Sequence, residues 1–232
     1  MRLDRFLTRR GTHPCKEVAR LLADGRVTVD GFPETSGLRR INRFSRIELD
    51  GEILQKHDAI YLMLHKPAGW LSATTDPEHP TVIELIDHPE RGTLHLAGRL
   101  DRASTGLLLL TNDGRWSKLV TEPDEEISKT YRITTRDPIS AETAAVFEQG
   151  IYFAYEDLTT RPAQLEILTP HEALLSIHEG RYHQVKRMFH AVGNKVLSLH
   201  RESIGPLKLD PDLAPGQSRL LTSGEICCFG VL

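Results

Sequence analysis

The segment GRLDRASTGLLLLTNDG, residues 98–114, is the most informative stretch of this chain. Its apolar run Leu107–Leu110 is long enough to predict a strand that is buried on both faces. The tripeptide Asn112-Asp113-Gly114 predicts a sharp turn directly after that strand. A fully buried strand belongs to the centre of a sheet, so we expect the rest of a domain to be built around it.

A loop that carries one carboxylate, Asp101, leads into the predicted strand. Catalytic groups are often held on loops that a rigid element supports. We expect the neighbouring Arg99 and Arg102 to keep this carboxylate ionised. On spacing alone, a surface turn in which Asp101 simply pairs with an arginine remains an alternative.

Outward from this segment, strand patterns outnumber helix patterns. Strands are predicted over 60–65, 107–111, 131–135, 163–168, 173–178 and 195–200, and helices over 82–86, 115–120, 141–149 and 182–192. Alternation of apolar and polar residues is common in the strands, which favours antiparallel pairing. We therefore predict an α+β fold in which residues 59–232 form a mainly antiparallel, mixed β-sheet with flanking helices.

Residues 1–58 predict a separate, small α/β unit that ends in a short polar linker. Apolar residues recur at helical spacing around Leu3–Leu7 and Val18–Leu22, and Asp30-Gly31 and Asp50-Gly51 are strong hairpin signals. Basic residues three or four positions apart gather on exposed helix faces: Arg2, Arg5, Arg9, Lys16 and Arg20. The unit resembles the small RNA-binding domain named after a ribosomal small-subunit protein; a generic capping subdomain is the alternative.

Basic residues are concentrated in two regions of the chain. The chain has 29 basic and 32 acidic residues, but residues 1–46 hold 11 basic against 5 acidic ones, and residues 178–201 hold five Lys+Arg, four His and one Glu. Local basic patches of this kind attract polyanions.

Three cysteines, a charged amino terminus and short apolar runs predict a cytosolic protein without a membrane span. Motifs for phosphate loops, dinucleotides and zinc are absent, so we expect neither cofactor nor metal.

Three segments together resemble the pseudouridine synthases. Residues 98–114 match the family's GRLDxxTxGLLLLTNDG loop, Lys129-Thr130-Tyr131 matches the head of a strand, and GRYHQVKRMFHAVGN matches at residues 180–194. They occur in the family's order and at about its spacing. The details look most like the RsuA branch, which modifies 16S ribosomal RNA; sister branches that act on 23S rRNA typically have NRQVRRM or NREVRRL here.

The resemblance implies roles for individual residues. Asp101 matches the catalytic aspartate, Tyr131 the tyrosine that stacks on the flipped base, and Lys186 the basic residue that pairs with the aspartate. Arg99 matches the arginine that supports base flipping. The same resemblance places RNA contacts at Arg99, Arg102, Arg181, His183, Gln184 and Arg187.

The helix predicted over 182–192 supports this placement independently. Val185, Met188, Phe189 and Val192 follow the i, i+3, i+4, i+7 spacing of a face packed into a core. The basic residues lie off that face, where they can hold an anion. An ordinary amphipathic helix would show the same pattern.

The implied reaction turns one uridine of 16S rRNA, uridine 516 in the family, into pseudouridine without a cofactor. The catalytic aspartate either attacks C1′ or removes the C2′ proton, and the sequence leaves both open. Alternatives are a synthase for 23S rRNA and a non-catalytic RNA-binding assembly factor. We expect a monomer whose partner is small-subunit rRNA or an assembly intermediate.

Overall fold

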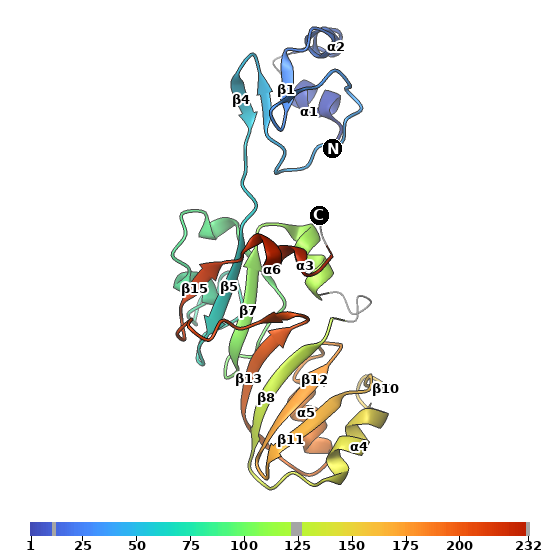
Figure 1. Cartoon of the computed structure of the whole chain (residues 1–232), viewed down its shortest axis with the longest axis vertical. Coiled ribbons are helices and arrows are strands. Elements are labelled where there is room, and N and C mark those ends of the chain that lie inside the picture. The colour runs from blue at the N-terminus through green and yellow to red at the C-terminus, as the bar shows by residue number, and fades with distance from the viewer. Residues whose placement is uncertain (11–12, 122–126, 231–232) are drawn as a thin grey trace. The chain divides into compact units, whose positions relative to one another are not determined.

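The computed structural model describes residues 1–10, 13–121 and 127–230. The chain separates into two compact units, Met1–Ala59 and Ile60–Leu232 (Figure 1). The sequence placed this boundary between residues 58 and 59, one residue earlier. Each unit has its own hydrophobic core.

The first unit consists of two helices and a small sheet. Its elements are α1 (Leu3–Arg9), α2 (Cys15–Ala23), β1 (Val27–Val29), β2 (Phe32–Pro33), β3 (Ile47–Leu49) and β4 (Glu52–Gln55). The sheet order is β2-β1-β3-β4, and every pair is antiparallel. Both predicted hairpins are present, with φ of 54° at Asp30 and 53° at Asp50, each followed by a glycine that also has positive φ. Such Asp-Gly pairs suit the turns that match the twist of paired strands.

The second unit is built on a nine-stranded sheet with the order β11-β12-β8-β13-β7-β5-β15, to which β14 and β6 add at β13 and β7. The strands are β5 (Tyr61–Lys66), β6 (His95–Ala97), β7 (Thr105–Thr111), β8 (Lys129–Thr135), β11 (Gln164–Thr169), β12 (Glu172–Ile177), β13 (Val196–Ile204), β14 (Leu207–Lys208) and β15 (Ser218–Leu220). Each pairing is antiparallel except that of β13 with β7. The predicted mainly antiparallel, mixed sheet is confirmed.

The parallel pairing of β7 with β13 joins the two antiparallel halves of the sheet. Only two register pairs form it, His200 with Thr105 and Arg201 with Gly106. Gly106 has φ of 106°, and a Cβ there would lie 2.3 Å from the carbonyl oxygen of Arg201. Glycine is therefore required at this position by the close approach of the two backbones.

Helices and loops cover the sheet and complete three hydrophobic clusters. The elements are α3 (Gly114–Thr121), α4 (Glu142–Gln149), α5 (Gln184–Ala191), α6 (Ser223–Cys227) and the 3₁₀ helices η1 (Val82–Leu85) and η2 (Arg91–Thr93). Phe147 of α4 and Phe189 of α5 pack edge to face, with ring centroids 5.1 Å apart. Residues Leu107–Leu110 are 0% exposed, so the predicted strand is buried on both faces.

Several predicted boundaries are wrong. The helix predicted over 82–86 is a 3₁₀ helix that ends at Leu85, α5 begins at Gln184 rather than at Tyr182, and β13 continues to Ile204. The sequence also missed short elements, because each carries too few residues for a periodic pattern: β6, β14, β15, α6, β9 (Tyr152–Phe153) and β10 (Leu158–Thr159).

Candidate active site

The loop that carries Asp101 runs from β6 to β7 and is bonded to the rest of the unit through its backbone. The hydroxyl of Ser72 donates to the carbonyl oxygen of Leu100 at 2.7 Å and accepts from the amide of the same residue at 3.2 Å. The amide of Ser104 donates to the carbonyl oxygen of Asp101 at 3.0 Å and closes a turn. The backbone on both sides of Asp101 is thus held in place.

Lys66, the last residue of β5, lies beneath this loop and is fully buried. Its ammonium group donates to three backbone carbonyl oxygens: those of Ser104 at 2.8 Å, Pro67 at 3.1 Å and Arg102 at 3.3 Å. Burial lowers the pKa of Lys66 to about 8, against the opposing effect of the Asp101 charge. The sequence missed this residue, because a lysine next to a proline indicates no more than the end of a strand.

A second buried cation, Arg201 on β13, braces the other side of the loop. Its Nε donates to the carbonyl oxygen of Leu107 at 2.7 Å and its Nη1 to that of Arg99 at 3.3 Å. The side chain is 1% exposed, a rare state for an arginine. Lys66 and Arg201 together tie the start and the end of the Asp101 loop to the central strands.

The carboxylate of Asp101 contacts two basic side chains from the start of α5. The Nζ of Lys186 donates to its Oδ2 at 2.7 Å, and the Nε2 of His183 lies 3.5 Å from its Oδ1. The Asp101 side chain is 27% exposed, so it is open to a ligand. His183 has φ of 50°, a conformation that is uncommon for a non-glycine residue and occurs often at functional sites.

A cavity of about 80 Å³ lies directly at this carboxylate. Asp101 and Lys186 line it together with Tyr131 of β8, and Arg99, Arg181 and His183 also contribute. Tyr131 is 6% exposed and pairs in register with Arg201 of β13. The structure therefore gathers the three proposed catalytic side chains, which are separated by up to 85 residues in the sequence, around one small space.

Lys186 pairs with Asp101 as expected, but the expected influence of the flanking Arg99 and Arg102 on this carboxylate needs correction. Arg102 turns away, and its Nε donates to the carbonyl oxygen of Gly69 at 3.0 Å. Arg99 is exposed and lines the cavity, but in the described part of the chain the salt bridges of Asp101 are those with Lys186 and His183. Sequence neighbours were a poor guide here because successive loop residues point in different directions.

Two of the residues predicted to contact RNA have internal roles. Gln184 is 3% exposed, and its side chain donates to Glu179 at 2.7 Å. Arg187 forms a salt bridge with Glu156 at 2.5 Å and lies over the ring of Phe153 at 3.7 Å from the centroid. Arg181 lines the cavity, but its Nε is also engaged by the buried Glu179 at 2.9 Å.

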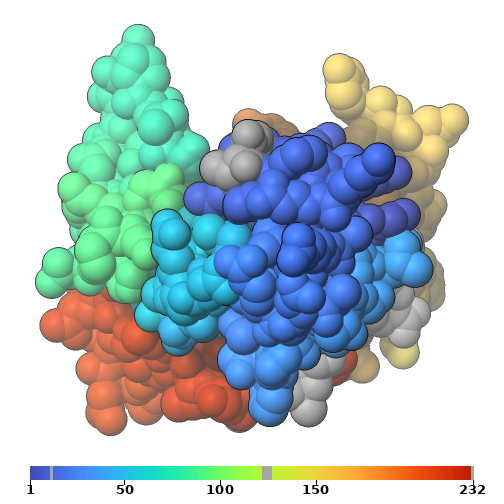
Figure 2. Space-filling model, turned by 90° about the horizontal axis from the view of Figure 1, so that it is seen from above, coloured from blue at the N-terminus to red at the C-terminus, as the bar shows by residue number. Residues whose placement is uncertain are grey.

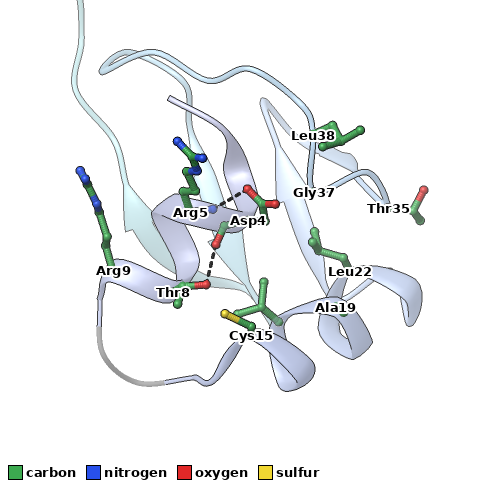
Figure 3. A pocket seen from close by; sticks show the side chains of 11 residues that line it. Asp4, Arg5, Thr8, Arg9, Cys15, Ala19, Leu22, Thr35, Gly37 and Leu38 are labelled. Atoms are coloured by element: carbon green, nitrogen blue, oxygen red, sulfur yellow. Dashed lines mark hydrogen bonds between the residues drawn. The ribbon is translucent and has the colours of Figure 1, made fainter.

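The other predicted basic residues lie in the first unit, whose surface is drawn in blue in Figure 2. Arg2 pairs with Asp4, and Arg20 with Asp24 at 3.7 Å. Arg5 and Arg9 of α1 form no salt bridge among the described residues, and Lys16 is exposed. A cavity of about 510 Å³ lies between α1, α2 and the segment 35–38 (Figure 3), with Arg5 and Arg9 contributing from the helix.

Residues 1–10, 13–121 and 127–230 hold no candidate metal centre, since no three His, Cys, Asp or Glu side chains come together there as a metal site. No helix in that part of the chain combines the length and apolar character that crossing a bilayer requires.

Comparison with known proteins identifies the family of this chain. A family model described as RNA pseudouridylate synthase matches residues 60–191. The chain is 49% identical to the ribosomal small subunit pseudouridine synthase A of Pseudomonas aeruginosa, over 98% of this chain and 99% of the relative. It is 45% identical to the protein of the same name from Escherichia coli (strain K12), over 97% and 98% of the two chains.

A solved structure agrees with these relatives. A crystal structure of a pseudouridylate synthase superimposes with a TM-score of 0.72 at 40% identity, and the match covers 99% of both chains. The chain belongs to the RNA pseudouridylate synthase family, and it is an isomerase of RNA uridines. The family resemblance seen in residues 98–114, 129–131 and 180–194 is confirmed.

Proposed function

We propose that this protein converts one uridine of 16S ribosomal RNA into pseudouridine, at the position numbered 516, and that it does so in the cytoplasm. The near full-length similarity to proteins named ribosomal small subunit pseudouridine synthase A supports this substrate. The observation that carries the chemistry is the contact between Asp101 and Lys186 at 2.7 Å, at a cavity that Tyr131 also lines.

The reaction moves one bond of the nucleotide and needs no external electrons. The N1–C1′ bond breaks, the uracil turns within the site, and C5 bonds to C1′ while its proton passes to solvent and N1 gains one. The Asp101 carboxylate takes part either by attacking C1′ or by removing the C2′ proton, and both routes require a free oxygen aimed at the sugar. Lys186 occupies Oδ2, which leaves Oδ1 for this task beside His183.

The remaining side chains position the base. A target uridine has to leave its stack to reach the Asp101 carboxylate at the cavity, at a cost of a few kcal/mol. The ring of Tyr131 offers a face on which the flipped uracil stacks, and its hydroxyl is suited to carry the C5 proton. Arg99 is exposed at the rim of the cavity, where it can fill the place that the base leaves in the RNA.

Mapping of pseudouridine in ribosomal RNA tests the substrate directly. Cells without the gene should lack one pseudouridine in 16S rRNA, and the wild-type gene should restore it. A missing pseudouridine in 23S rRNA would show that the enzyme acts on the large subunit. An unchanged pseudouridine map would favour a binding protein without catalytic function.

Asp101→Asn is the sharpest variant for the chemistry. Asn keeps the size and one acceptor oxygen, but it is a far weaker nucleophile and base. The variant should fold, bind rRNA at least as tightly as the wild type because one negative charge is removed, and form no detectable pseudouridine. Turnover near the wild-type rate in a folded Asp101→Asn protein would contradict the assignment.

Tyr131→Phe separates stacking from proton transfer. Phe keeps the π face, whose stacking on a base is worth about 1–3 kcal/mol, so RNA binding should be retained. Loss of the hydroxyl should lower turnover by roughly 10²-fold or more if it relays the C5 proton. Turnover equal to that of the wild type in single-turnover assays would leave stacking as the only role of this residue.

A further inference from the structure

A second cavity adjoins the catalytic cavity through a shared residue. It has a volume of about 510 Å³, and Lys186 lines both spaces. The new cavity is bounded by Arg136 after β8, by His190 of α5 and by Lys195 before β13, among others. We propose that this groove, called here the basic groove, binds the sugar-phosphate backbone of the RNA strand next to the target uridine.

The residues of the basic groove come from separate elements, and backbone bonds fix their relative positions. The amide of Arg136 donates to the carbonyl oxygen of Lys195 at 2.9 Å. Between them, the buried side chain of Asn194 accepts from the amide of Asp137 at 3.2 Å and donates to the carbonyl oxygen of the same residue at 2.8 Å. These hydrogen bonds therefore hold the backbone around the groove in place without a ligand.

The end of α5 shapes the other side of the groove. Gly193 has φ of 79°, and the amide of Asn194 donates back to the carbonyl oxygen of Phe189 at 2.9 Å. This is the pattern of a helix that stops at a left-handed glycine. The chain then turns directly into Lys195 and β13, which brings the lysine to the groove.

Basic side chains extend along the groove, beginning with Lys186 at the Asp101 carboxylate. Lys186 and His190 are four residues apart on α5, so they lie on one helix face about 6 Å apart along its axis. Lys186 is engaged by Asp101, and Arg136 by Asp137 at 2.8 Å. Lys195 is exposed and has no salt bridge among the described residues, as is also true of His190. These two side chains are available for an incoming anion.

A polyanionic strand fits this arrangement better than a small molecule. The groove is open, basic side chains line it, and it starts where the target nucleotide would be held. An RNA strand whose uridine enters the catalytic cavity has to continue on either side of it, and phosphates are what basic side chains bind along such a path. This inference rests on the proposed function.

The first experiment compares two lysines by their effect on salt dependence. Lys195→Gln and the matched control Lys208→Gln remove the same charge from exposed positions of the same unit. Lys195 precedes the first residue of β13, whereas Lys208 pairs with Ser203 near the other end of that strand. Binding of a 16S rRNA fragment that contains the target uridine is measured with the full-length protein between about 50 and 200 mM salt.

Lys195→Gln should raise Kd about two- to fivefold and lower the slope of log K against log salt by about 0.7, the value of one phosphate on a single strand. It should raise KM with kcat unchanged, because Lys195 does not line the catalytic cavity. Lys208→Gln should change none of these. An unchanged slope in Lys195→Gln would overturn the proposal and point to a different ligand, such as an acidic protein segment.

A second experiment locates the contact on the RNA. Single neutral methylphosphonate linkages are placed one at a time on both sides of the target uridine. At one position, the substitution should weaken binding by the wild type but have no further effect on Lys195→Gln, since both changes remove the same contact. Additive losses at every position would contradict a direct phosphate contact. If the wild type forms no pseudouridine either in this RNA or in a small-subunit assembly intermediate, the proposed function fails, whereas the binding comparison still tests the groove.

Discussion

Positive charge is used differently in the two units of this protein. In the second unit, Lys66 and Arg201 are buried and donate to backbone carbonyl oxygens. In the first unit, Arg5 and Arg9 are exposed on α1 and have no carboxylate in a salt bridge among the described residues. Buried cations stabilise a defined backbone geometry, whereas exposed ones attract a polyanion and contribute little to folding.

This difference bears on how the Asp101 loop is held, because the cations that donate to its backbone come from other elements. A loop stabilised by surface ion pairs would lose its shape when an RNA phosphate competes for them. Here, the ammonium of Lys66 and the guanidinium of Arg201 are buried, so RNA phosphates do not compete for them. The exposed cations remain free to exchange water and counterions for phosphate.

Gly106→Ala should have the largest effect on the buried region. The new Cβ would lie 2.3 Å from the carbonyl oxygen and 2.6 Å from the amide nitrogen of Arg201, at a φ of 106°. Because both atoms are backbone, the β7–β13 pairing has to separate, and we expect a loss of more than about 3 kcal/mol in the free energy of unfolding. Thermal unfolding measures it.

Gly114→Ala is the matched control for this change. Gly114 begins α3, and a Cβ added at this residue would have nothing within 4 Å. Alanine favours the helical conformation over glycine by about 0.8–1 kcal/mol, so this variant should be as stable as the wild type or more so. Equal melting temperatures for the two variants would refute the close approach of the β7 and β13 backbones at Gly106.

Lys66→Met should have the next largest effect. Three carbonyl oxygens lose their donor, and the bond to Ser104 is buried, where an unsatisfied group costs about 1–3 kcal/mol. We expect the free energy of unfolding to fall by about 2 kcal/mol or more and turnover to fall with it, because residues 102–104 are no longer held. Denaturant unfolding that matches the wild type would show that the lysine does not stabilise the loop.

The same pair of proteins gives a pH test. Burial lowers the pKa of Lys66 to about 8 from its ordinary value of 10.5. Between these two values the unfolded chain binds more protons at this lysine than the folded protein, so stability from this group rises with pH. The difference in free energy of unfolding between wild type and Lys66→Met should therefore grow from pH 8 to about pH 10.5. A difference that shrinks over this range would reverse the assigned pKa direction.

Substitution of both Arg5 and Arg9 by Gln should have the smallest effect on folding. Exposed charges of this kind change stability by no more than about 0.5 kcal/mol. RNA binding should nevertheless weaken, and its salt slope should fall by about 0.7 per lost contact with single-stranded RNA. A large loss of stability, or an unchanged salt slope, would contradict the distinction between buried cations that stabilise the second unit and exposed cations that bind RNA in the first.

The central part of the fold could be predicted from local sequence. The run Leu107–Leu110 and the Asp-Gly turns carry strong patterns, because complete burial needs continuous apolar residues and a tight hairpin needs left-handed backbone. The short strands β6, β14 and β15 could not be predicted, because two or three residues are too few to show a periodic pattern. They form only where a longer neighbouring strand is available for pairing.

The site was predicted in part. Asp101, Tyr131 and Lys186 could be chosen because their segments match a family in order and spacing, but the internal roles of Gln184 and Arg187 could not. Whether a basic or polar side chain faces the cavity or a buried Glu179 depends on contacts from other elements. Helical periodicity predicts which face of the helix a side chain lies on, but not which residue it contacts there.

By itself, the sequence determined the buried central strand, the division near residue 58 and the family to which the chain belongs. Only the tertiary structure decided that Lys66 and Arg201 support the Asp101 loop, that His183 joins Lys186 at the Asp101 carboxylate, and that a basic groove adjoins the cavity. The physical reason is that local patterns record burial and turns along the chain. Contacts between residues such as Lys66 and Ser104, 38 positions apart, arise only when strands pair.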